Sequence, residues 1–129
     1  MTQTEPATAN PIDFSALVGV CLGRPEFAAK LLRIFLQQAP GWRDGVRGAV
    51  DGQDAEGIRE ICHAIRGGAG AILAEEIVAT AERLVDCGRT PGLPGLEEAR
   101  QALIQSIEAA EASVQAYLGD EPLARPSAG

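Results

Sequence analysis

The chain has 129 residues, which is enough for one domain whose core needs neither disulfides nor a structural metal. Its formal net charge of −7 opposes binding to a phosphate backbone, and its single Lys and scattered Arg form no basic face for a membrane. No apolar run could span a bilayer, and residues 1–11 lack the pattern of a signal peptide. We therefore expect a cytoplasmic protein that binds neither nucleic acid nor a membrane.

Few residues are aromatic, and Ala, Leu, Glu, Gln and Arg dominate the middle of the chain, which favours helices over sheet. Residues 12–21 form a short apolar stretch that predicts a first helix, which Gly23 separates from the next. From Pro25 to Val50 apolar residues recur every three or four positions, which is the period of one helical stripe. The stripe keeps its phase through Pro40, so we predict one long kinked helix.

After a turn at 51–53, with Asp51 or Asp54 as the next N-cap, two further helices are expected, separated by a break in the pattern at 71–75. Residues 89–95 are the clearest loop, and a last helix follows from Leu96. The third helix carries the apolar series Ile58, Cys62, Ile65, Ala69 and Ile72. These stripes predict an all-α fold, an antiparallel up-and-down four-helix bundle with a short extra N-terminal helix. The bundle is expected over residues 12–118, with flexible tails at 1–11 and 119–129.

The three cysteines give no evidence of a metal site. Cys21, Cys62 and Cys87 lie far apart, form no Cys-x-x-Cys pair, and have only one His in the chain to join them. We therefore predict reduced, buried or half-buried thiols and no bound metal.

The only histidine, His63, lies on the third helix about 150° away from the centre of its apolar face, so its ring should point to solvent. Three glycines follow it in the local sequence HAIRGGAG: Gly67, Gly68 and Gly70. Each glycine inside a helix lowers its stability by about 0.5–1 kcal/mol relative to Ala. Three of them together therefore need an explanation.

One reason is that the missing side chains let another protein approach the imidazole. A neutral imidazole is a competent nucleophile toward phosphorus, and Arg66, one turn along, could balance the charge of a phosphoryl group. Arg59 and Glu60, one turn before His63, are then candidates for partner contacts. The alternative is an ordinary surface histidine followed by glycines that end the helix.

Residues 55–85 resemble the histidine-containing phosphotransfer (HPt) family, including the N-terminal domain of chemotaxis kinases. The likeness centres on the pattern His-x-hydrophobic-(Lys/Arg)-Gly, here His63-Ala64-Ile65-Arg66-Gly67, and extends over the long preceding helix. It implies that His63 accepts a phosphoryl group, that Arg66 takes the usual Lys position, and that Gly67 and Gly68 keep the approach open. It also implies a carrier rather than a catalyst.

The implied partners are receiver domains of response regulators and a hybrid or chemotaxis-type histidine kinase. The chain needs no cofactor of its own, since the receiver would supply the Mg²⁺. The sequence departs from the family pattern at two positions. Leu73 replaces a common Gly ten residues after the histidine, and Val85 replaces a Gln or Glu that often orients the ring. Glu82 or Asp86 could orient it instead, or form a solvated acidic face.

The sequence is also compatible with two other functions. The same bundle could act as an unphosphorylated binding module that regulates a receiver or kinase by docking. An enzyme that uses Cys62 and His63 as a dyad is disfavoured, because adjacent helix positions point about 100° apart.

Overall fold

The computed structural model describes residues 12–89 and 95–119, and within these ranges all regular structure is helical. The helices are α2 (Phe14–Val20), α3 (Pro25–Asp51), α4 (Ala55–Ala71), α5 (Glu75–Gly88) and α6 (Leu96–Gly119). The predicted tail at 1–11, most of that at 119–129 and the loop segment 90–94 lie outside the described residues. Gly119, where the C-terminal tail was predicted to begin, is the last residue of α6.

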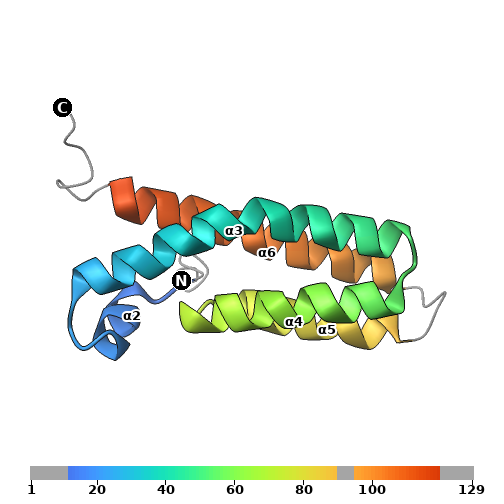
Figure 1. Ribbon diagram of the computed structural model, residues 1–129, viewed down its shortest axis with the longest axis horizontal. Helices are drawn as coiled ribbons and strands as arrows, with labels where there is room; N and C mark the ends of the chain where they lie inside the picture. Colours follow the sequence, from blue (N-terminus) through green and yellow to red (C-terminus); the bar gives the residue numbers. More distant parts are fainter. Residues whose placement is uncertain (1–11, 90–94, 120–129) are drawn as a thin grey trace, which may run out of the picture.

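The four long helices form the predicted bundle. Both α3 and α5 pack against α4 and α6, which places each helix between its two neighbours in an up-and-down arrangement. The short α2 lies at one end and packs on α3 (Figure 1). The rings of Phe14 and Tyr117 stack with centroids 4.2 Å apart, which also ties α2 to α6. The predicted fold class is therefore confirmed.

Helix α3 runs without interruption through Pro40, as its apolar stripe predicted. Pro40, which has no N–H to donate to the carbonyl of Leu36, is exposed, so its ring lies on the solvent side of the helix. In Figure 1 the helix changes direction along its length. On the opposite side Phe35, Ala39 and Trp42 are all buried, so the stripe continues across the proline.

The apolar stripes meet in one core that all five helices share. Full burial of a Leu, Ile or Phe side chain contributes about 1.5–3 kcal/mol, so these stripes supply most of the driving force for assembly. In the part of the chain that the structure covers, no helix is both long and apolar enough to cross a membrane. The largest fully buried side chains include Leu17, Leu32, Phe35, Ile58, Ile65, Ile77, Leu84, Leu103 and Ile107.

The start of α4 is fixed by Asp54, one of the two predicted caps. Its Oδ1 accepts a hydrogen bond of 3.0 Å from the backbone N–H of Gly57. A Cβ at Gly57 would lie 2.5 Å from Asp54 Oδ2, so the glycine leaves room for the capping carboxylate. This cap determines where the helix that carries His63 begins.

The end of α4 explains one departure from the family pattern. The N–H of Ala74 donates to the carbonyl of Ala69 at 2.9 Å, and that of Leu73 donates to Gly70 at 3.1 Å. These are the two bonds of a Schellman motif, whose central residue takes a left-handed conformation that glycine adopts most easily. Leu73 has a φ of 60°, so the chain forms the same turn without the glycine. Its partly buried side chain packs against the core, which compensates for the backbone strain.

Candidate functional site

His63 lies near the middle of α4, on the side of the helix that faces solvent. Its neighbours Cys62 and Ile65 are fully buried, so the core fixes the rotation of the helix and the direction of the imidazole. Among the described residues, no hydrogen bond or ion pair reaches the ring. The direction of the imidazole is therefore set by the position of His63 on α4, and the ring is accessible to a reagent or a partner.

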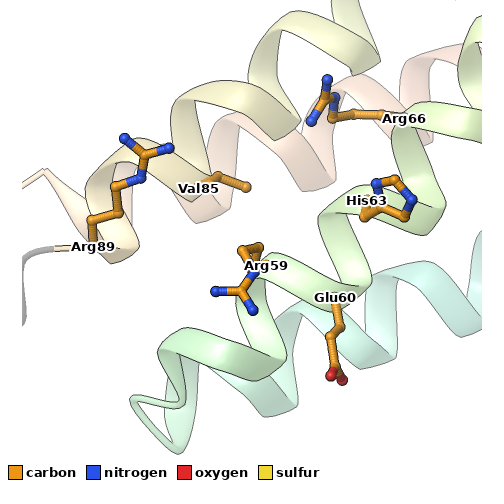
Figure 2. A pocket seen from close by; sticks show the side chains of 6 residues that line it. All are labelled: Arg59, Glu60, His63, Arg66, Val85 and Arg89. Atoms are coloured by element: carbon orange, nitrogen blue, oxygen red, sulfur yellow. The ribbon is translucent and has the colours of Figure 1, made fainter.

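The ring borders an open hollow between α4 and α5 with a volume of about 600 Å³. Figure 2 shows the lining side chains arising from these two helices and from the residue that follows α5. The lining residues are Arg59, Glu60, His63 and Arg66 of α4, with Val85 of α5 and Arg89 at its C-terminal cap. Four of the seven residues predicted for the site from sequence thus border one hollow.

Each arginine of the hollow pairs with a carboxylate. Arg59 pairs with Glu56 at 2.6 Å, and Arg66 Nη2 lies 3.5 Å from Glu82 Oε2. Arg89 lies 3.9 Å from the Asp86 carboxylate. All three pairs are well exposed, and such pairs contribute at most about 1 kcal/mol, so they can exchange partners at small cost.

The structure gives His63 no orienting partner of the kind that the sequence suggested. Glu82 pairs with Arg66 and Asp86 with Arg89, so neither carboxylate contacts the imidazole. Val85 does border the hollow, but its aliphatic side chain can neither donate nor accept a hydrogen bond. None of the described side chains therefore fixes the tautomer of the ring through a hydrogen bond.

The three glycines after His63 have different surroundings, and all of them lie within the last turns of α4, which ends at Ala71. A Cβ at Gly67 or Gly70 would meet no atom within 4 Å, so both leave the surface bare. A Cβ at Gly68 would lie 2.6 Å from Cζ2 and Cη2 of the Trp42 indole. Packing of α4 on α3 therefore requires Gly68, and the role of this glycine in the approach surface stays a prediction.

Cys62 does not form a reactive pair with His63. Burial raises the pKa of the Cys62 thiol to about 11, although the positive charge of Arg66 opposes the rise. A thiol with this pKa is almost entirely protonated near neutral pH and is a poor nucleophile. In the described part of the chain, no group of three or more His, Cys, Asp or Glu side chains could hold a metal ion.

The site and the fold together define a helical domain that presents its single histidine beside a hollow lined by three arginines. The model of the Hpt domain family matches residues 30–113, and the chain belongs to this family. This confirms the resemblance noted in the sequence. Hpt domains take part in histidine phosphotransfer within phosphorelays, as carriers rather than catalysts. No curated protein and no solved structure matched the chain.

Sequence reasoning missed Arg89 as a residue of the site. The available signal was its spacing, because Arg89 follows Val85 by four positions and so shares its side of α5. Recognising that side as part of the site required the packing of α5 on α4, which the sequence does not specify.

Proposed function

We propose that the chain relays phosphoryl groups and that His63 is the phosphoaccepting residue. One observation carries this proposal: the only histidine of an Hpt-family chain is exposed in the middle of α4, beside a hollow that Arg66 also lines. The phosphoryl group would come from the aspartate of a receiver domain, or from a histidine kinase, and would pass to the aspartate of another receiver.

The proposed transfer needs little from this chain beyond a correctly presented imidazole. The lone pair of one ring nitrogen forms a bond to phosphorus, the P–O bond of the acyl phosphate breaks, and the aspartate leaves as a carboxylate. The second ring nitrogen holds its proton or releases it to water. Transfer onward is the same step in reverse, in which the acceptor carboxylate attacks and the imidazole leaves. The receiver would supply the Mg²⁺ that balances the negative charge of the transferred phosphoryl group.

Arg66 is proposed to balance the charge of the phosphoryl group on His63. It lies one turn after the histidine on the same side of α4, and its exposed contact with Glu82 measures 3.5 Å. A phosphoryl group bears more negative charge than a carboxylate and offers three acceptor oxygens, so it can take the guanidinium away from Glu82.

The proposed docking surface for partners surrounds the histidine. Gly67 and Gly70 have open space where a side chain would be, which lets a receiver loop come close to the imidazole. The exposed side chains of Arg59 and Glu60 lie on the other side of His63 and are proposed to contact the partner. Gly68 contributes to this surface only indirectly, by seating α4 on Trp42.

The test is transfer from a ³²P-labelled phosphorylated receiver or an active hybrid kinase. We expect label on the wild-type chain that is labile in acid and stable in alkali, and no label on His63→Gln. Arg83→Gln is a matched control, since Arg83 is exposed on α5 and does not line the hollow. Failure of the wild type to take label from several cognate donors would contradict the relay. It would favour the alternative of an unphosphorylated module that regulates by docking.

A further inference from the structure

The hollow beside His63 is lined mainly by arginines, although the chain has a net charge of −7. Three arginines line it, Arg59, Arg66 and Arg89, against the single carboxylate of Glu60. Figure 2 shows the Glu60 carboxylate pointing away from the side chains of Arg66 and Arg89. Among the side chains that line the hollow, the cationic ones therefore outnumber the carboxylates.

The counter-charges of these arginines lie outside the hollow. Glu56, Glu82 and Asp86 each pair with one of them, yet none of the three carboxylates is among the lining residues. Each arginine of the hollow is thus balanced, before phosphorylation, by a carboxylate that does not line the hollow. Since all three pairs are exposed, the guanidinium groups can reorient toward a stronger anion with little loss.

We propose that Arg59 and Arg89, together with Arg66, form a cradle that binds the phosphoryl group on His63. Arg59 lies one turn before the histidine and Arg66 one turn after it, while Arg89 approaches from α5. Their three guanidinium groups can donate hydrogen bonds to the three oxygens of the tetrahedral phosphoryl dianion. This inference rests on the proposed function for the identity of the anion.

Arg89 offers the hydrogen bonds that Val85, which stands where the family often has Gln or Glu, cannot make. A polar side chain at this position of α5 could contact the ring or its phosphoryl group, whereas valine offers no hydrogen bond. Arg89 lies one turn further along and lines the same hollow. The cradle therefore holds the phosphorylated ring through its phosphoryl oxygens rather than through the second ring nitrogen.

The test uses phosphoramidate, a small donor that requires no partner protein. A ring nitrogen of His63 forms the new P–N bond, the P–N bond of phosphoramidate breaks, and ammonia leaves with the proton that the imidazole gives up. Because His63 is the only histidine, the product bears one phosphohistidine. Its second phosphoryl pKa is then measured by ³¹P NMR in the wild type, Arg59→Gln and Arg89→Gln, with Arg83→Gln as control.

Removing either cradle arginine should raise the phosphoryl pKa by about 0.2–0.7 units, because each exposed cation stabilises the dianion only modestly. Arg83→Gln should leave this pKa unchanged, and 1 M salt should reduce the differences between the variants. Circular dichroism should show the same helix content in all four proteins, since the substituted side chains are exposed.

Two results would overturn the cradle: an unlabelled wild type under excess phosphoramidate, or the same phosphoryl pKa in Arg59→Gln, Arg89→Gln and Arg83→Gln. The relay itself is judged separately, by transfer from phosphorylated receivers. A chain that shows the shifted phosphoryl pKa but exchanges no phosphate with receivers would support the cradle and contradict the relay.

Discussion

The neighbouring glycines Gly67 and Gly68 should respond in opposite ways to the same substitution. Gly67→Ala places a methyl group where no atom lies within 4 Å. It therefore gains about 0.5–1 kcal/mol of stability, the usual cost of glycine inside a helix. Gly68→Ala gains the same amount but drives its Cβ to 2.6 Å from two ring carbons of Trp42, a rigid and buried side chain.

The cost of that collision decides the outcome at Gly68. Forcing an extra carbon into a packed core costs about 1–3 kcal/mol, which meets or exceeds the helix gain. Gly68→Ala should therefore be less stable than Gly67→Ala by about 1–3 kcal/mol, or roughly 4 °C in Tm for each kcal/mol. Urea denaturation followed by circular dichroism measures this difference directly.

A second mutation tests whether Trp42 is the cause. Trp42→Leu removes the two ring carbons, so in that background Gly68→Ala should cost no more than Gly67→Ala does. Equal stability of the two single alanine variants in the wild-type background would refute the packing explanation. In the transfer assay Gly67→Gln should keep the fold yet slow phosphorylation by about tenfold or more, since it covers the approach to His63.

Three further predictions concern stability. Asp54→Ala removes the cap of α4 and should lower the free energy of unfolding by about 1 kcal/mol in urea, whereas an unchanged midpoint would mean that the cap is not needed. Leu22 is 83% exposed with a φ of 61°, so Leu22→Gly should raise Tm by relieving a left-handed conformation that costs about 1–2 kcal/mol, and a lower Tm would argue against strain there. The pKa of the Cys62 thiol is about 11 in the folded protein and about 8.5 when unfolded. The stability that the neutral Cys62 thiol contributes is fully present below its pKa in the unfolded chain and is lost as the pH rises toward 11. Urea midpoints should therefore fall between pH 8 and 10.5 more steeply in the wild type than in Cys62→Ala.

The helices could be predicted because each has its own apolar stripe, and a stripe is local information. The phase of the stripe across Pro40 was enough to predict one continuous α3. The exposure of His63 followed from the same reasoning, since its position on the helix wheel depends only on the neighbouring buried residues.

The contacts between helices could not be predicted in this way. The collision partner of Gly68 is Trp42, which lies on another helix, so the need for this glycine appears only once the register of α3 and α4 is known. The choice of Glu82 to pair with Arg66, and not with His63, likewise depends on how α5 sits against α4. Side-chain pairing across helices is set by packing rather than by local period.

The hollow beside His63 lies on one side of the bundle, and its single histidine imposes an order of events on the proposed relay. Donor and acceptor must use the same small area, so they compete for it and cannot form a ternary complex around the imidazole. The kinetics should then be ping-pong, with the donor leaving before the acceptor arrives. Between the two encounters the phosphoryl group stays on His63, so the lifetime of the phosphohistidine limits how long the signal lasts.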